Sequence, residues 1–462
     1  MKKKTDKKKR LKLWFLTSIC LIILIPVISI LIIRFEGEKP FVEFTVFNPS
    51  IGISQDFKIA VYDKKSGLKK VWISILKDSK ETVILEKKFK NAGFGLKGNV
   101  FEKIFDIQLK PEEIGLTDGK AVLRLAVRDY SWQKWFKGNI TYIEKDVVID
   151  IKSPEIDILS HTMYLNQGGS GVAVYRLSEK CLKSGVCVGE NFFQGYSGYF
   201  NDSDIYLAFF AVAYNQKSDT EIFLKATDKA DNSSAIGFPH KIKTKNFKKD
   251  IIKISDGFLS WKMPEFGNDT GKEKAKNPVA KFLEVNNRLR AANFVQLKKI
   301  ADKTDNILYW SGSFLRLPKS ATRAGFADHR EYRYNGKIID KQTHMGIDLA
   351  SIAQARVPAA NKGKVVFAGL LGIYGKTVVI DHGFNLFSMY SHLSSIIVEK
   401  NRIVSKGEFI GRTGKTGLAG GDHLHFGMFI HNTFVNPIEW WDSSWINNNI
   451  MSKVNIVNSQ DN

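Results

Sequence analysis

The stretch GDHLHFGMFI, Gly421–Ile430, carries two histidines one residue apart in an otherwise apolar run. The run predicts a buried β-strand, in which alternate residues point to the same face. His423 and His425 therefore share a face, with Gly427 next in line. Two imidazoles on one buried face bind a metal, carry protons or fill a core, and the surrounding residues narrow this choice.

Apolar segments upstream of this strand predict a β-rich domain over residues 305–442. They include GKVVFAGL, KTVVIDHG and LFSMYSHL, and Gly-rich turns such as LLGIYGK and GRTGKTGLAGG lie between them. Short strands joined by tight turns form a scaffold whose loops can frame a groove.

A second polar pair lies in THMGIDLA, where three residues separate His344 from Asp348. The two side chains share a face in a strand, and positions i and i+4 also share a face in a helix. Gly346 between them is expected to leave room for an ion.

The two segments together offer the ligands of a small metal site. Two imidazole nitrogens and one carboxylate oxygen suit Zn²⁺, whose catalytic sites keep a fourth position open for water. One histidine of the 423/425 pair and His392, in MYSHLSS, then remain for proton transfer.

The motifs HMGIDLA, YSHL and HLHF occur in this order, together with VPAANKGKVVFAG and KGEFIGRTGKTG. The set closely resembles the LytM/lysostaphin-type zinc metallopeptidases, endopeptidases that cut the peptide stems and cross-bridges of peptidoglycan. The resemblance covers residues 305–442, under a third of the chain. It implies Zn²⁺ as the cofactor and peptidoglycan as the substrate. The upstream segment AGFADHREYRYNGK matches the family's entry segment only loosely.

The resemblance also implies a role for each site residue. His344, Asp348 and His425 match the family's metal ligands, and His392 and His423 match its catalytic histidines. Some relatives have lost ligands and only activate other wall enzymes, whereas all five positions are present here.

The remaining histidines are predicted to have structural roles, except His329. Those expected in cores or turns are His161, His240, His382 and His431. His329, in ADHRE, is a candidate for the edge of the groove. The pair Trp440 and Trp441 is predicted to pack in the core.

The N-terminus combines a basic segment with an apolar run. Residues 1–12 carry +7 of the formal charge of +22, and Leu13–Ile33 contains no charged residue. At 1.5 Å per residue the apolar run forms a helix of roughly 31 Å, which matches the hydrocarbon core of a bilayer. We interpret residues 13–33 as an uncleaved transmembrane anchor and residues 1–12 as cytoplasmic.

This topology predicts a single-pass inner-membrane protein whose remaining domains are periplasmic or otherwise extracytoplasmic. Nucleic acid is therefore not an expected partner, although the chain is basic. Anionic wall or membrane material is the expected polyanion.

Alternating segments predict two β-sandwich, immunoglobulin-like domains at residues 40–153 and 154–247. Examples are FVEFTVF and KAVLRLAVRDYS in the first and SGVAVYRL and IYLAFFAVAY in the second. Similar strand endings at Asp129 and Asp228 suggest a tandem repeat. Cys181 and Cys187 are expected to form a small disulfide loop, with two reduced thiols as the alternative.

Residues 248–304 are predicted to be a helical linker. The apolar positions that fit an amphipathic helix are Phe282, Leu283, Val285, Leu289, Ala292 and Val295. The linker is expected to pack on a neighbouring domain, and a sharper alternative is that it gates the groove. Residues 443–462 are predicted to be a loose polar tail.

The chain is thus expected to be mainly β and to act as a membrane-anchored zinc endopeptidase on peptidoglycan. One alternative is a non-catalytic activator that uses the same groove to bind a cell-wall amidase. Another is an envelope scaffold in which the β-sandwich domains bind a protein partner.

Overall fold

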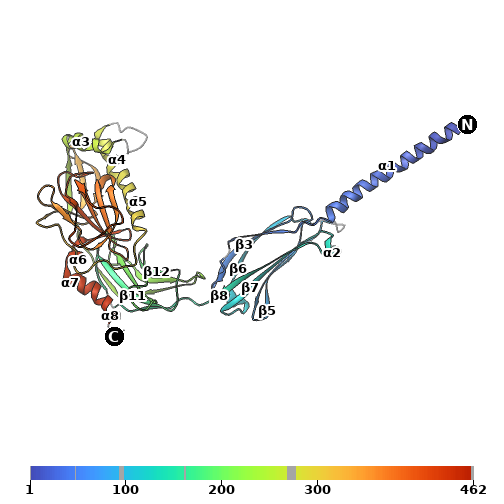
Figure 1. Cartoon of the computed structure of the whole chain (residues 1–462), viewed down its shortest axis with the longest axis horizontal. Helices are drawn as coiled ribbons and strands as arrows, with labels where there is room; N and C mark the ends of the chain where they lie inside the picture. Colours follow the sequence, from blue (N-terminus) through green and yellow to red (C-terminus); the bar gives the residue numbers. More distant parts are fainter. Residues whose placement is uncertain (1, 47, 93–97, 161–162, 268–276, 459–462) are drawn as a thin grey trace. The chain divides into compact units, whose positions relative to one another are not determined.

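The computed structural model describes residues 2–46, 48–92, 98–160, 163–267 and 277–458 (Figure 1). The chain divides into two compact units, and each is described separately. The first contains Met1–Ser153 with Lys229–Asn232, and the second contains Pro154–Asp228 with Ser233–Asn462. Strands predominate in both units, so the prediction of a mainly β chain is confirmed.

Helix α1 (Lys2–Arg34) contains the predicted apolar run. Within it, Lys9–Ile32 has a mean hydropathy of 2.9 and is long enough to cross a membrane, a property that a signal sequence near an N-terminus shares. Leu13, Trp14 and Ile22 are largely exposed. A long helix with an apolar surface of this kind is solvated better by lipid than by water.

The β-strands of the first unit form two sheets, in the orders β1-β3-β6 and β2-β8-β7-β4-β5. Their bounds are β1 (Phe41–Val46), β2 (Ser50–Ile51), β3 (Gln55–Tyr62), β4 (Leu68–Lys77), β5 (Lys80–Lys88), β6 (Glu102–Leu109), β7 (Gly119–Asp129) and β8 (Ile140–Ile149). Alternate residues of β7 are buried, and Leu125 and Val127 share one core with Ile59 and Val61 of the other sheet. Each such burial stabilises the fold by about 1.5–3 kcal/mol.

Smaller sheets begin the second unit, in the orders β14-β11-β9, β13-β12-β15-β16 and β10-β17. Their bounds are β9 (Ile156–Ile158), β10 (Met163–Asn166), β11 (Ser170–Leu177), β12 (Lys183–Val188), β13 (Asn191–Gln194), β14 (Ile205–Ala211), β15 (Ile222–Thr227), β16 (Ser233–Gly237) and β17 (His240–Lys243).

Cys181 and Cys187 are free thiols, so the expected disulfide is wrong. Cys187 lies in strand β12, whose residues extend away from Cys181. At about 3.3 Å per residue, the four steps from Lys183 to Cys187 alone span roughly 13 Å. A disulfide requires Cα atoms within about 7 Å, so the extended strand keeps the thiols apart.

The predicted helical linker begins with a strand, which is a correction. Strand β18 (Lys249–Ile254) pairs in parallel with β20 (His329–Tyr334), and β20 pairs with β21 (Lys337–Thr343). The helices follow as α3 (Asp256–Lys262), 3-10 helix η2 (Met263–Phe266), α4 (Pro278–Glu284), π-helix η3 (Val285–Leu289) and α5 (Arg290–Ala301).

The π-helix explains why the predicted apolar face is only partly correct. Phe282 and Val285 are buried as expected, but Val295 is 52% exposed and Leu297 is buried instead. A π-turn contains an extra residue and rotates the following helix relative to the preceding one. The buried face of α5 therefore continues through Asn293 and Leu297.

The principal sheet of the C-terminal part has the order β19-β22-β30-β26-β25-β24-β28, and β31 pairs with β30. Its strands are β19 (Ala321–Ala324), β22 (Ile347–Ala350), β24 (Gly363–Leu370), β25 (Lys376–Asp381), β26 (Leu386–Leu393), β28 (Ile403–Val404), β30 (Leu424–Ile430) and β31 (Thr433–Val435). A smaller sheet, β23-β29-β27, is built from β23 (Arg356–Pro358), β27 (Ser395–Ile396) and β29 (Phe409–Arg412).

The predicted loose tail is also a correction, because residues 443–458 are helical. Helix α6 (Pro437–Trp441) leads into α7 (Ser443–Ile446), π-helix η5 (Asn447–Met451) and α8 (Ser452–Asn458), beside β11 (Figure 1). Ile446, Ile450 and Val454 recur every four residues and are at most 1% exposed. This narrow apolar stripe docks the tail on the core.

Side chains of α6 connect the C-terminal part to the preceding sheets. The indole Nε1 of Trp440 donates to Ser170 Oγ at 3.1 Å, and the carboxylate of Glu439 accepts from the backbone nitrogen of Ser170 at 2.9 Å. Trp440 is fully buried and Trp441 stacks on Phe426, as predicted for core residues. The second unit consequently has one continuous hydrophobic core.

Candidate metal centre and active site

Strand pairing brings the first polar residues of the site together. β22 and β30 are antiparallel neighbours, and their register places Asp348 opposite His425. His344 lies just before β22 and approaches the same two side chains. Residues 77 positions apart in the chain thus meet because two strands are adjacent in the sheet.

Three donor atoms of these residues form a small triangle. His344 Nε2 lies 3.0 Å from Asp348 Oδ1 and 3.0 Å from His425 Nδ1, and His425 Nδ1 lies 2.9 Å from Asp348 Oδ1. For Zn–N distances of about 2.0–2.1 Å, tetrahedral ligand atoms lie roughly 3.3 Å apart. The triangle therefore has nearly the size that a zinc ion requires.

Backbone carbonyls fix which nitrogen carries the proton in three of the four histidines of the site. Nδ1 of His344 lies 2.8 Å from Gly325 O, Nδ1 of His392 lies 2.8 Å from Thr416 O, and Nδ1 of His423 lies 2.9 Å from Gly421 O. A carbonyl only accepts, so these Nδ1 atoms donate and leave their Nε2 atoms as acceptors.

The donor set fits a cation for a further reason. His344 Nε2 and Asp348 Oδ1 are both acceptors when the imidazole is neutral, yet they lie 3.0 Å apart. Two acceptors at this distance repel each other unless a proton or a metal ion lies between them. His425 Nδ1 converges on the same two atoms, and a buried cluster of three potential ligand atoms is typical of a metal centre.

Two further histidines complete the site. His392, near the end of β26, and His423, just before β30, have ring centroids 4.9 Å apart. His423 Nε2 lies 3.6 Å from Asp348 Oδ1, and the His392 ring lies 5.8 Å from that of His425. His392 has a φ of 62°, a strained conformation for a residue other than glycine. Such strain often occurs at functional sites, where surrounding structure holds it.

The protonation tendencies of these groups differ. Burial disfavours the charge of Asp348, but the neighbouring His344 and the hydrogen bonds of the histidines hold the pKa of this carboxyl well below its usual range. Burial lowers the pKa of His392 well below its usual range and that of His425 to about 4. Burial also opposes protonation of His423, but Asp348 raises its pKa. An ionised carboxylate beside the neutral imidazole of His425 is the state that binds a metal ion.

Gly346 has a different role from the one expected. A Cβ at this position would lie 2.6 Å from Cε1 and Nε2 of His425, so the glycine makes room for the imidazole ring rather than for an ion. Likewise, a Cβ at Gly427 would meet Phe434 and Met389 instead of the site.

Gly346→Ala is therefore expected to lower the affinity for Zn²⁺ by roughly 10-fold or more, because His425 must move. The added Cβ would also lie 2.8 Å from the backbone oxygen of Phe426, which cannot easily yield. Competition with a fluorescent zinc chelator measures the affinity. Gly420→Ala is the control, since its Cβ meets no atom within 4 Å. Equal affinities of both variants and the parent chain would contradict the role of Gly346.

The other described histidines lie outside the cluster of five site residues. His382 is buried, with Nδ1 2.8 Å from Lys362 O and Nε2 2.7 Å from Ser388 Oγ, and burial lowers its pKa to about 4. His240 contacts the carbonyl of Phe238, and His431 is half-buried with no hydrogen-bond partner for its ring among the described residues. His161 lies outside the described residues.

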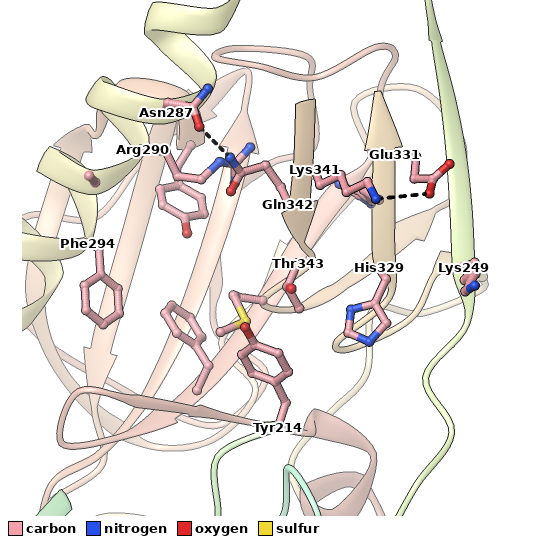
Figure 2. A pocket seen from close by; sticks show the side chains of 15 residues that line it. Tyr214, Lys249, Asn287, Arg290, Phe294, His329, Glu331, Lys341, Gln342 and Thr343 are labelled. Atoms are coloured by element: carbon pink, nitrogen blue, oxygen red, sulfur yellow. Dashed lines mark hydrogen bonds and ion pairs between the residues drawn. The ribbon is translucent and has the colours of Figure 1, made fainter. Parts of the chain in front are cut away.

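His329 lines a pocket of about 710 Å³ beside the site rather than the site itself (Figure 2). Thr343 and Met345, the chain neighbours of His344, line the same pocket, as do Tyr214 and Arg290. The pocket therefore adjoins the segment that carries His344.

The linker packs on loops that lead into the site. The buried Nζ of Lys262 donates to Lys415 O at 2.7 Å, next to Thr416, whose carbonyl holds His392. Asn293 Oδ1 accepts from the backbone nitrogen of Ile373 at 2.9 Å. The expected packing on a neighbouring domain is thus observed, whereas gating of the groove stays a prediction.

Sequence reasoning missed Arg330. Its Nη2 donates to Asp348 Oδ2 at 2.7 Å, from strand β20 in the segment that matched the family pattern only loosely. The signal available in the sequence was a single arginine 18 residues upstream of Asp348, which does not by itself predict a contact.

Fold and geometry bring two histidines and one carboxylate together as a candidate metal centre, flanked by two further histidines on a β-scaffold. Residues 342–437 match Peptidase family M23, and this part of the chain is an M23 peptidase domain. The resemblance inferred from HMGIDLA, YSHL and HLHF is thereby confirmed.

Curated proteins that are similar to this part of the chain are named as peptidases. DD-carboxypeptidase/endopeptidase Mpg of Neisseria meningitidis is 33% identical over 137 residues, 30% of this chain and 31% of that protein. Peptidoglycan DD-endopeptidase ShyB of Vibrio cholerae is 31% identical over 116 residues, 25% of this chain and 26% of that protein. The matches thus span less than a third of these curated relatives.

A crystal structure of a peptidase M23 from Pseudomonas aeruginosa aligns with 59% of this chain and 93% of its own, at 18% identity and a TM-score of 0.38.

Proposed function

We propose that this chain is a zinc metalloendopeptidase that hydrolyses peptide cross-links of peptidoglycan. The observation that carries the proposal is the triangle of His344 Nε2, Asp348 Oδ1 and His425 Nδ1, with edges of 2.9–3.0 Å. The M23 domain supports a peptidase, and relatives named peptidoglycan DD-endopeptidases support the substrate class.

His344, Asp348 and His425 would hold the zinc ion. When bound, zinc polarises a carbonyl and makes water a nucleophile near neutral pH. The buried position of the three ligands excludes bulk water and strengthens electrostatic interactions with the substrate.

His392 and His423 handle protons in this proposal. Both present Nε2 as an acceptor, because Nδ1 of each donates to a backbone carbonyl. One Nε2 receives a proton from the water whose oxygen bonds to the scissile carbonyl carbon. As the carbon–nitrogen bond breaks, that proton passes to the leaving nitrogen and gives an amine. The other product is a carboxylic acid that retains the second proton of the water and releases it to solvent as it ionises to a carboxylate.

The rest of the chain would place the enzyme in the envelope. Helix α1 would act as a single-pass inner-membrane anchor with residues 1–12 in the cytoplasm and the other domains in the periplasm. The sheets of residues 40–153 and 154–247 are proposed to be immunoglobulin-like domains that are free to bind an envelope protein, followed by the linker of residues 248–304 and the peptidase domain of residues 305–442.

The test is digestion of cross-linked peptidoglycan by the detergent-solubilised full chain loaded with Zn²⁺. Mass spectrometry should show cross-linked fragments replaced by monomers, with one water added per bond cut. A chelator should stop the reaction, and added Zn²⁺ should restore it. Tight zinc binding without any cleavage would instead favour the non-catalytic activator of an amidase.

A further inference from the structure

Asp348 uses its two carboxylate oxygens differently. Oδ1 faces the histidines, at 3.0 Å from His344 Nε2 and 2.9 Å from His425 Nδ1. Oδ2 points away and accepts from Arg330 Nη2 at 2.7 Å. The arginine therefore occupies one oxygen and leaves the other directed into the site.

Arg330 has a second acidic neighbour, at ion-pair distance but beyond hydrogen-bonding range. Its side chain is 19% exposed, and its Nε lies 3.6 Å from Oδ2 of Asp250. Asp250 is the direct neighbour of Arg330 in the parallel pairing of β18 with β20. Acidic groups thus flank the guanidinium on two sides, in the order Asp250, Arg330, Asp348.

We propose that Arg330 is a positioning residue that fixes the carboxylate of Asp348 with Oδ1 toward the metal, and that Asp250 fixes Arg330. The inference rests on the proposed zinc site. Groups that hydrogen-bond to metal ligands orient them, and their loss typically lowers metal affinity by about 10–100-fold. The planar fork of arginine suits this task, because it directs several N–H groups at fixed angles.

Asp250 and Arg330 lie outside the part of the chain that matches the family. Both precede the M23 match at residues 342–437. Strand β18 begins the linker, so the linker contributes to the metal centre of a domain that follows it. The ligand geometry then depends on whether β18 is paired with β20.

Charge alone predicts the opposite effect on affinity. A cationic guanidinium close to the site repels a divalent ion, and its removal would raise the affinity if electrostatics dominated. Asp250 offsets part of this repulsion, and the short hydrogen bond to Oδ2 makes orientation the larger effect. The direction of the change therefore separates the two explanations.

The experiment measures Zn²⁺ affinity of the full chain by chelator competition. Arg330→Gln is expected to bind Zn²⁺ about 10-fold or more weakly. Asp250→Asn should show a smaller loss. In the Arg330→Gln background, Asp250→Asn should cost less than a further two-fold, since Asp250 acts through Arg330. Arg330→Lys should recover only part of the affinity, because it keeps the charge but not the fork.

Arg333→Gln is the matched control, because Arg333 lies on the same strand and pairs with Glu331 instead of Asp348. Co²⁺ serves as a second probe. The visible spectrum of bound Co²⁺ should change in Arg330→Gln and stay unchanged in Arg333→Gln, a difference that loss of stability alone would not produce.

An equal or higher Zn²⁺ affinity of Arg330→Gln, with an unchanged Co²⁺ spectrum, would overturn the inference. Full additivity of the two substitutions would overturn the role of Asp250. Failure of the parent chain to bind Zn²⁺ would overturn the proposed metal centre as well, so the two failures are distinguishable.

Discussion

His344→Ala is expected to abolish cleavage of cross-linked peptidoglycan, with a loss of roughly 1,000-fold or more. His344 Nε2 is one corner of the donor triangle, and only Asp348 and His425 would remain at 2.9 Å from each other. Two protein ligands are fewer than the three that catalytic zinc sites provide. The measurements are the rate of fragment release by mass spectrometry and the zinc content of the purified variant.

His240→Ala is a suitable control for this variant. His240 lies on β17 and contacts the carbonyls of Phe238 and Thr220, not the site. It should retain its zinc and cleave within about two-fold of the parent chain. Cleavage by His344→Ala at the parental rate would show that the triangle is not the catalytic centre.

His392→Ala and His423→Ala are expected to lower cleavage by roughly 10²–10⁴-fold while leaving zinc bound. Neither ring contributes an atom to the triangle, but both present Nε2 beside it. The expected phenotype is therefore a protein that binds Zn²⁺ within a few-fold of the parent chain but no longer moves protons efficiently. Zinc affinity and single-turnover cleavage rates separate these effects.

The double variant sharpens this prediction. If both histidines serve the same proton transfer, the loss in His392→Ala/His423→Ala should be much smaller than the product of the two single losses. His329→Ala, on the exposed side of β20, should cleave like the parent chain. Loss of zinc from His423→Ala would instead indicate that His423 is a ligand.

The fold could be predicted wherever local pattern and tertiary packing agree. Strands such as β7 alternate between buried and half-exposed residues, and this period is visible in KAVLRLAVRDYS. The C-terminal tail was predicted wrongly because the buried apolar residues of its helices, Ile446, Ile450 and Val454, lie among many polar residues. Such a stripe has meaning only when a partner surface is known. The disulfide prediction was wrong because strand β12 extends the chain between Cys181 and Cys187, although the two cysteines are close in sequence.

The linker shows a second limit of sequence patterns. A uniform helical period predicts Val295 on the buried face, whereas the π-turn at Val285–Leu289 shifts that face to Asn293 and Leu297. Strand β18 was not predicted, because its partner β20 lies some 80 residues downstream. Neither a π-turn nor a distant strand partner leaves a clear local signal.

The sequence by itself determined which side chains could bind a metal or transfer protons, and how far apart they lie in the chain. Within HMGID and HLH, donors two or four residues apart share a face by backbone geometry alone, and the motif order identified the M23 domain. Only the tertiary structure decided how distant segments converge. It paired Asp348 with His425, turned Nε2 of three histidines inward through carbonyls at residues 325, 416 and 421, and added Arg330 and Asp250. The physical reason is that side-chain convergence depends on strand register and loop path, which long-range pairing fixes.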